Sequence, residues 1–172
     1  LIVLKEFHAE SFEELFQGVK KIPFEQYIGK YDAFPVKSGH ALNSTLHSIP
    51  DCQSIIKKAA VERLKEKYHN SWFEETGAVF PIQFSIIKDE VVIYLDTTGT
   101  GLHKRGYRRN SNDAPIKETL AAGIIDLARV RGDSVVCDPF CGSGTLLIES
   151  AYKALSVAPG LKRKFLAEKW DC

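Results

Sequence analysis

The sequence lacks the features that mark a metal-binding or disulfide-stabilised protein. It contains no methionine, and its four cysteines include no C-x-x-C pair. Structural zinc sites usually draw on such pairs, so we expect no metal centre. The cysteines are also too few and too scattered for the disulfide framework of a small secreted protein. We therefore expect reduced thiols and a cytoplasmic location.

Long apolar runs and an excess of charge are lacking as well. No apolar run approaches the roughly 20 residues that a membrane-spanning helix requires, and no signal-peptide pattern opens the sequence. The formal net charge is only +1. Attraction of a nucleic acid must therefore come from local clusters of basic residues rather than from the charge of the whole chain.

The two ends of the sequence indicate a fragment. The first residues, Leu1–Leu4, already have the pattern of a strand, and the sequence stops at Trp170–Cys172 without a helix-ending signal. Together with the missing methionine, these features lead us to expect that the N-terminal part of the first domain and the later part of the second lie outside this sequence.

Residues 1–99 show the alternating patterns of an α/β domain. The segment 1–7 predicts a short buried strand, and Ser11 with Glu14 forms the capping box of a following helix. A second amphipathic helix is predicted after Asp51 as its cap, with an apolar face formed by Cys52, Ile56, Ala60, Leu64 and Tyr68. Between the two helices, residues 27–36 indicate an interrupted strand and residues 38–50 a loop.

Two alternating apolar segments close this first part. Residues 80–86 and 91–95 flank a polar turn and predict an antiparallel hairpin. Because proline cannot donate to a strand ladder, Pro81 is expected at a sheet edge or at the start of a strand.

A glycine-rich break at residues 97–101 places a domain boundary near residue 100, followed by a basic linker over 100–113. A helix is then predicted with Asp113 as its cap, Pro115 in its first turn and Gly132 as its stop. Its apolar face is expected to hold Ile116, Leu120, Ile124 and Leu127. A strand over 134–137, a glycine turn and a helix over 144–155 complete the pattern. This order predicts the beginning of a doubly wound α/β sheet.

The glycine turn could hold one of three ligands. A P-loop ends in Gly-Lys-Ser/Thr, but Gly144 is followed by Thr145 and Leu146. A dinucleotide fingerprint needs a third small residue, which is also missing. S-adenosylmethionine carries no phosphate, and its amino-acid part suits an acidic residue such as Asp138 beside free backbone N–H groups. The turn therefore favours S-adenosylmethionine. Cys137 and Cys141, which flank it, are expected to be small buried packing residues.

The motif at this turn resembles a known signature. Asp138, Pro139, Phe140, Cys141, Gly142, Ser143, Gly144 and Thr145 are similar to the D-P-F-x-G-S-G-T motif of class I S-adenosylmethionine-dependent methyltransferases that modify base amino groups. Residues 115–121 resemble the segment that precedes this motif beside the cofactor. The resemblance implies cofactor contacts for all eight motif residues and for Lys117 and Glu118.

The resemblance extends over nearly the whole sequence. Residues 101–108 are similar to the linker of the RNA methyltransferase family in which an RNA-binding THUMP domain precedes the methyltransferase domain, and residues 34–40 and 48–64 resemble the THUMP part. The nearest group is the bacterial 23S ribosomal RNA guanine-N2 methyltransferases, whose members are often labelled adenine-specific DNA methylases. The implied domains are a THUMP-like domain over 1–99 and the start of a Rossmann-like methyltransferase domain over 114–172.

Basic residues near an aromatic ring suggest where RNA could bind. Lysine and arginine contact phosphates, and an aromatic ring can stack on an exposed base. The main candidates in the linker are His103, Lys104, Arg105, Tyr107, Arg108 and Arg109; weaker candidates in the first domain are Lys37, His40, Lys57, Lys58 and Arg63. Solvated or paired charges are an equal alternative for the linker, whereas a solvated helix surface is the favoured interpretation of the basic helix face in the first domain.

The sequence contains no residue to which a catalytic role can be assigned. In the family that the sequence resembles, an N/D-P-P-Y/F motif holds the target base, and this sequence contains no such motif. We therefore name no catalytic residue and expect this stretch to be inactive on its own. Three interpretations remain: an RNA guanine-N2 methyltransferase, a DNA adenine-N6 methyltransferase, and a non-catalytic RNA-binding THUMP module. The THUMP-like part favours RNA.

Overall fold

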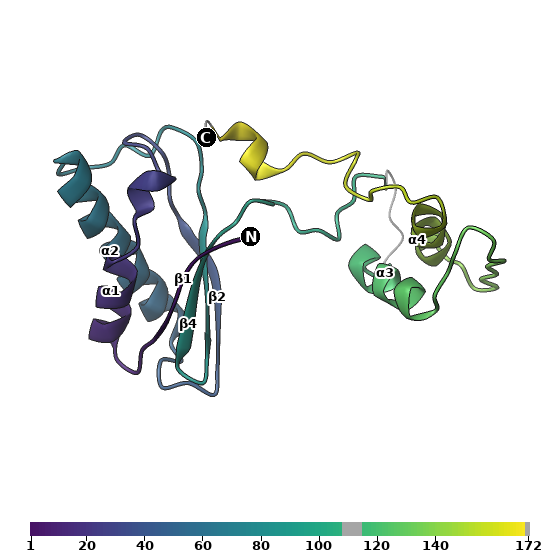
Figure 1. Ribbon diagram of the computed structural model, residues 1–172, viewed down its shortest axis with the longest axis horizontal. Helices are drawn as coiled ribbons and strands as arrows, with labels where there is room; N and C mark the ends of the chain where they lie inside the picture. The colour runs from purple at the N-terminus through teal and green to yellow at the C-terminus, as the bar shows by residue number, and fades with distance from the viewer. Residues whose placement is uncertain (108–114, 171–172) are drawn as a thin grey trace. The chain divides into compact units, whose positions relative to one another are not determined.

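The computed structural model describes residues 1–107 and 115–170, which divide into two compact units (Figure 1). The first unit comprises Leu1–Gly99 and the segment that begins at Leu166, and the second comprises Thr100–Phe165. In the part of the chain that the structure describes, no helix is both long and apolar enough to cross a membrane.

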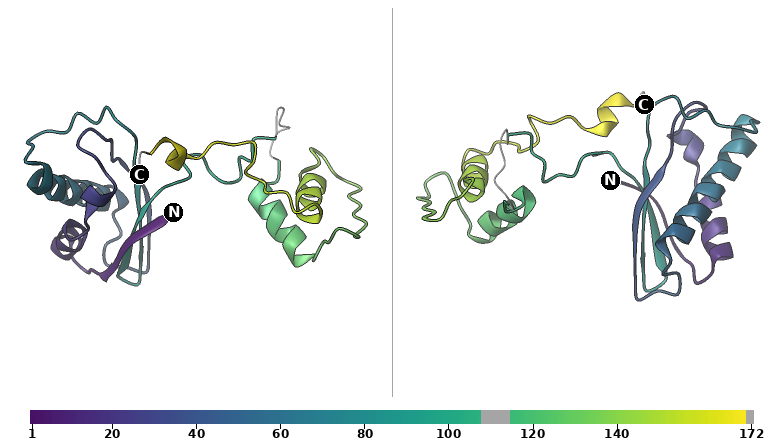
Figure 2. Two further views of the ribbon diagram at one scale, coloured as in Figure 1. Left: turned by 45° about the horizontal axis from the view of Figure 1, so that its top comes forward. Right: turned by 180° about the vertical axis from the view of Figure 1, so that it is seen from behind.

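The first unit is a sheet covered by helices on one face (Figures 1 and 2). The sheet has the order β1-β4-β3-β2. β2 runs parallel to β3, whereas β1 with β4 and β3 with β4 are antiparallel. Its strands are β1 (Ile2–His8), β2 (Val36–Leu42), β3 (Ile82–Ile87) and β4 (Glu90–Leu95); its helices are α1 (Phe12–Lys20), α2 (Ile49–Tyr68) and the 3-10 helices η1 (Phe24–Gln26) and η2 (Leu166–Lys169).

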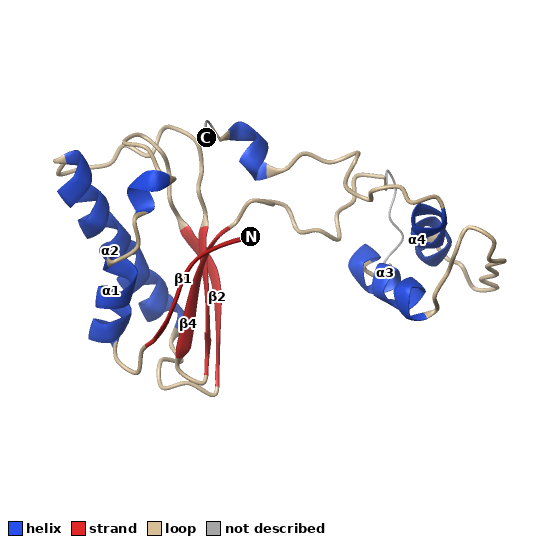
Figure 3. Cartoon of the chain, viewed as in Figure 1, coloured by secondary structure: helices blue, strands red, loops and turns tan. Residues whose placement is uncertain are grey.

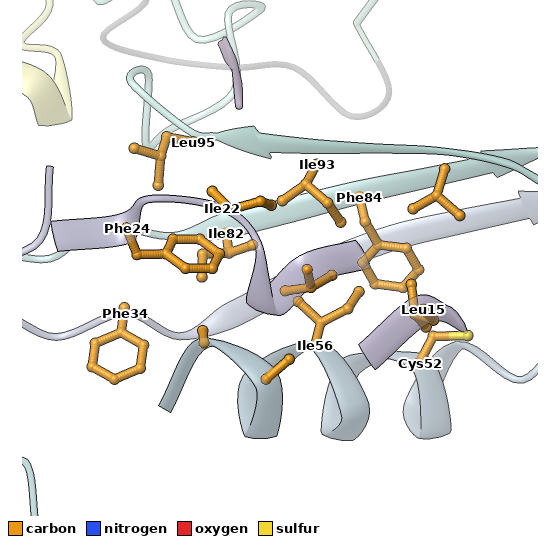
Figure 4. Close-up of a cluster of buried hydrophobic side chains, with 14 of the residues drawn as sticks. Leu15, Ile22, Phe24, Phe34, Cys52, Ile56, Ile82, Phe84, Ile93 and Leu95 are labelled. Atoms are coloured by element: carbon orange, nitrogen blue, oxygen red, sulfur yellow. The ribbon is translucent and has the colours of Figure 1, made fainter. Parts of the chain in front are cut away.

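The core of this unit lies between the helices and the sheet (Figure 4). Leu15 of α1 and Ile56 of α2 meet Phe84, Ile93 and other sheet residues there, and all of them are almost fully buried. Removing each such side chain from water contributes about 1.5–3 kcal/mol. The predicted apolar face of α2 is confirmed for Cys52, Ile56, Ala60 and Leu64, while Tyr68 is half-buried and donates a hydrogen bond to the Ile28 carbonyl.

Local sequence signals position α1 and the hairpin as predicted. The Ser11 hydroxyl accepts from the Glu14 N–H at 3.2 Å, and the Glu14 carboxylate accepts from the Ser11 N–H at 3.1 Å, so the capping box is complete. β3 and β4 form the expected antiparallel pair, and Pro81 lies directly before the start of β3. β1 forms too, but the prediction that it is buried is wrong, because it is an edge strand with mostly exposed residues.

The segment between α1 and α2 differs from the prediction. β2 occupies the first part of the predicted loop, because it pairs in parallel with β3, more than forty residues away. Of the strand predicted over 27–36, only Val36 belongs to a strand, as the first residue of β2, and Ala33 forms an isolated bridge with Val79. α2 begins at Ile49 with Ser48 as its N-cap, and Asp51 accepts a 2.6 Å hydrogen bond from the Ser48 hydroxyl instead of capping the helix.

The second unit contains two helices joined by long loops, α3 (Glu118–Leu127) and α4 (Thr145–Ala154) (Figure 3). The helix predicted after the glycine turn is confirmed as α4. The predicted strand over 134–137 is not formed, and Val135 is 98% exposed. A strand needs a hydrogen-bonded neighbour, and the described residues of this unit contain no other strand.

The predictions for α3 were only partly correct. The helix starts at Glu118 with Lys117 as N-cap, after Pro115, and ends at the Ala128 cap, well before Gly132. Its expected apolar face is exposed at Leu120, Ile124 and Leu127, whereas Ala121 and Ile125 are buried. In the described residues the apolar face has no covering layer, so packing against α4 selects the other face. The predicted cap, Asp113, lies outside the described residues.

The last described residues return to the first unit. The Ala167 N–H donates to the Thr97 carbonyl at 3.1 Å. The Trp170 ring stacks on Phe80 with centroids 4.5 Å apart, and its indole N–H donates to the Val79 carbonyl at 3.0 Å. The sequence predicts this segment as part of the second domain, and the domain limits stay a prediction.

Candidate functional site

The glycine turn that leads into α4 depends on two residues in the left-handed region. Gly142 has φ +52° and Gly144 has φ +70°, a conformation that side chains with a Cβ disfavour. Gly144 is also the N-cap of α4, and its N–H donates to the Cys141 carbonyl at 2.7 Å. The glycines of the motif are therefore required by the backbone itself.

The same two glycines leave open space in front of the helix. A Cβ built on Gly144 would meet no atom within 4 Å, and one on Gly142 would meet only the Phe140 carbonyl oxygen at 4.0 Å. The first N–H groups of any helix have no intrahelical acceptor and attract negative charge. The turn thus offers donors and room for a ligand that carries a carboxylate.

An acidic and a hydroxyl group lie on the turn. The half-buried Asp138 accepts a 3.1 Å hydrogen bond from the Phe140 N–H, which orients its carboxylate at the entrance of the turn. The hydroxyls of Ser143 and Thr145 are hydrogen-bonded to each other at 3.1 Å. Phosphate-binding loops carry a lysine among such groups, whereas this turn carries a carboxylate.

The flanking cysteines do not have the environment expected from the sequence. Cys137 and Cys141 are both exposed free thiols, so the prediction that they are buried is wrong. The predicted strand before Asp138 is not formed, and Cys137 is left exposed. No group of three or more potential metal ligands occurs among the residues that the structure describes.

The two candidates outside the motif lie at the start of α3. Lys117 is the exposed N-cap, and Glu118 is buried with 6% of its surface accessible. Their contacts with a cofactor stay a prediction.

A buried carboxylate that the sequence analysis missed organises part of the basic linker. Glu149 of α4 is only 3% exposed, accepts a 3.0 Å hydrogen bond from the Tyr107 hydroxyl and lies 3.5 Å from the Arg105 Nε. The Tyr107 ring also lies against Tyr152, with centroids 5.6 Å apart. The sequence signal that could have identified Glu149 was a charged residue on the otherwise buried face of α4. These contacts favour a structural role for Arg105 and Tyr107.

The remaining linker candidates are placed differently. Lys104 is exposed and His103 is half-buried. Arg108 and Arg109 lie outside the described residues. A role in RNA binding stays a prediction for all four.

Two candidates in the first unit have protein partners. Lys57 forms an ion pair with Glu75, donates to the Phe34 carbonyl at 3.2 Å and lies 3.6 Å above the Phe34 ring. Arg63 donates to Glu25 through Nε at 3.0 Å and forms an ion pair through Nη2; this bond holds the pKa of the Glu25 carboxyl below its ordinary value. These contacts favour structural roles.

The other first-unit candidates are less constrained. Lys58 lies 5.8 Å over the Phe16 ring, and Lys37 and His40 are exposed on β2. The structure therefore does not gather the predicted RNA-binding residues of this unit into one cluster of free charges.

Comparisons with known proteins match both parts of the chain. A model of the THUMP domain matches residues 9–96, and a model described as an RMKL-like methyltransferase domain matches residues 105–171. The Bacillus subtilis protein YpsC, whose name assigns it as an RNA methyltransferase, is 48% identical over 96% of this chain and 43% of its own length. The ribosomal RNA large subunit methyltransferase K/L of Psychromonas ingrahamii is 36% identical over 99% of this chain and 23% of its own length.

One solved structure has the same fold as this chain. SMU.472, whose structure is described as that of a methyltransferase complexed with SAH, has a TM-score of 0.88 and 44% identity, covering 98% of this chain and 45% of that one. The chain thus spans less than half the length of each of these relatives.

Proposed function

Because this chain belongs to the family in which a THUMP domain is followed by an RMKL-like methyltransferase domain, we propose that the protein containing it methylates an exocyclic base amine of RNA. The methyl donor is S-adenosylmethionine, and the target is guanine N2 of 23S ribosomal RNA. The relatives named for ribosomal RNA and for RNA methylation support the choice of RNA, and of ribosomal RNA, as the substrate class.

The glycine turn carries the proposal. Gly142 and Gly144 leave the mouth of α4 open, and Asp138 puts a carboxylate beside it. The carboxylate of the methionine part suits the helix N-terminus, and its ammonium suits Asp138. When bound, S-adenosylmethionine supplies an electrophilic methyl group on its sulfonium. The proposed cofactor contacts are residues 138–145, with Lys117 and Glu118.

The chain divides these tasks between its two parts. The proposed THUMP domain, residues 1–99, binds RNA; residues 100–113 form the linker; and residues 114–172 begin the methyltransferase domain. No N/D-P-P-Y/F motif occurs in this sequence, so the groups that hold the target base are proposed to lie elsewhere in the longer protein.

Calorimetry on the longer protein tests the cofactor site. Gly144→Ala and Gly142→Val should weaken binding of S-adenosylmethionine, because both place a Cβ in the open turn. Gly123→Ala is the matched control, since its Cβ also meets nothing within 4 Å but lies on α3. Unchanged affinity of the turn variants would remove the cofactor assignment.

A deletion strain tests the substrate. Ribosomal RNA from that strain should lack one N2-methylated guanine, and the purified protein should restore it. Loss of methyladenine from DNA would instead establish the DNA methyltransferase alternative. Binding of RNA without any methyl transfer would establish the RNA-binding module.

A further inference from the structure

Two basic segments far apart in the sequence meet in the second unit. Arg163 donates through Nη1 to the Gly101 carbonyl at 3.0 Å and the Lys104 carbonyl at 3.4 Å, and through Nη2 to the Thr100 carbonyl. One guanidinium therefore ties residues 162–164 to the beginning of the basic linker.

A glycine permits this close approach. Gly106 has φ +85°, and a Cβ at this position would lie 2.5 Å from the Lys162 carbonyl oxygen. Such a contact is impossible without movement of one segment. The Arg163 hydrogen bonds thus hold the segments side by side, and the missing side chain at Gly106 permits their close approach.

The basic side chains in the two segments have different environments. Arg163 is half-buried, and its guanidinium lies 4.8 Å from the Phe165 ring centroid. Lys104, Lys162 and Lys164 are exposed. Among the described residues, none of these three ammonium groups takes part in an ion pair. The arginine serves the fold, and the lysines remain available to solvent.

We propose that Lys104, Lys162 and Lys164 form one phosphate-binding surface for the backbone of the RNA substrate. The inference rests on the proposed function for the choice of RNA and extends its binding site to residues 162–164. Lysine is a compact charge on a flexible stem, so three lysines on adjoining segments suit phosphates of the backbone rather than a particular base. Binding of phosphates at this surface positions the RNA without recognising its base sequence.

Salt dependence of binding tests this surface. The longer protein is titrated with a mixed-sequence single-stranded RNA oligomer over a range of salt concentrations. Lys162→Ala with Lys164→Ala should weaken binding and reduce the slope of log affinity against log salt by about 1.4, or roughly 0.7 for each lost phosphate contact. Arg129→Gln with Arg131→Gln removes the same charge from exposed positions of the second unit that are not among the RNA-binding candidates, and should leave the slope nearly unchanged.

A second variant tests the arrangement without altering any charge. Gly106→Ala should push the two segments apart and weaken RNA binding, while an unchanged far-UV circular dichroism spectrum reports an intact fold. Unchanged RNA affinity of Gly106→Ala would show that the lysines do not act as one surface.

Failure of this inference can be told apart from failure of the proposed function. An unchanged salt slope in the double lysine variant, in a protein that methylates ribosomal RNA, overturns only the surface. A reduced slope in a protein that methylates no RNA supports the surface and removes the activity. A reduced slope in a protein that methylates DNA but no RNA would keep the phosphate-binding surface and show that RNA is the wrong partner.

Discussion

The Tyr107 hydroxyl donates a 3.0 Å hydrogen bond to the buried carboxylate of Glu149. Glu149 lies about one turn along the helix that begins at the glycine turn, and Arg105 approaches the same carboxylate at 3.5 Å. The linker is therefore attached to the helix whose first residues form the proposed cofactor turn. This attachment gives a physical connection between the proposed RNA path and the proposed cofactor site.

Glu149→Ala should destabilise the second unit strongly. The change leaves the 12%-exposed Arg105 side chain without its carboxylate, and breaking a buried ion pair typically costs about 3–5 kcal/mol. Tyr107→Phe removes only the hydroxyl and should cost about 0.5–1.5 kcal/mol. Urea unfolding followed by circular dichroism measures both. Equal and small effects would show that Glu149 is not the anchor.

Asp96 should make the first unit less stable in acid. Burial raises the pKa of its carboxyl, but hydrogen bonds from the Thr98 hydroxyl, the Thr98 N–H and the Gly99 N–H outweigh this, so the pKa lies below its ordinary value. A lowered folded-state pKa gives stability that is complete above the unfolded value of about 3.9 and is lost as pH falls through the folded value.

Asp96→Asn isolates that contribution. The variant should be less stable than the unmodified protein at neutral pH, and the difference between them should shrink below about pH 4. The free energy of unfolding, measured in urea at a series of pH values, gives the comparison. A difference that stays constant with pH would contradict the role assigned to the carboxylate.

Two glycine substitutions should have opposite effects. A Cβ at Gly39 of β2 would lie 2.2 Å from the buried Phe84 ring, so Gly39→Ala should destabilise by about 1–3 kcal/mol. Gly123 of α3 has no atom within 4 Å of a built Cβ, so Gly123→Ala should stabilise by about 0.5–1 kcal/mol. Thermal unfolding distinguishes them, and a stabilised Gly39→Ala would refute the packing argument.

Trp170 should contribute to the stability of the first unit. Trp170→Ala loses the stack on Phe80 and the hydrogen bond to Val79, with an expected cost of roughly 2 kcal/mol. Trp170→Phe keeps a ring and should cost about half as much. Trp72, which is 75% exposed, provides the control, and Trp72→Ala should have little effect on urea unfolding. Equal losses in the two alanine variants would show that the stack contributes nothing.

Features specified by neighbouring residues were predicted well. The capping box at Ser11 and Glu14 and the hairpin of β3 and β4 depend on residues close together in the sequence. The glycine turn was also found, because positive φ at Gly142 and Gly144 demands a residue without a side chain. These signals depend on residues that are close in the sequence, so they do not require a distant part of the chain.

Features that depend on distant partners were missed. β2 is polar at Lys37 and His40 and exists because β3 offers a parallel edge. Conversely, residues 134–137 have a strand pattern but find no neighbouring strand among the described residues. Hydrogen-bonded neighbours, and not the pattern alone, decide whether a strand forms.

The sequence by itself determined the motif at residues 138–145, the family resemblance and the residue types available for binding. Only the tertiary structure decided which charges are used internally: Arg105 against Glu149, Arg63 against Glu25, and Arg163 against the backbone of residues 100–104. It also left Lys104, Lys162 and Lys164 exposed on two adjoining segments. A charge in the sequence carries no information about its partner, because that partner is selected by which distant segments the folded chain brings within hydrogen-bonding distance.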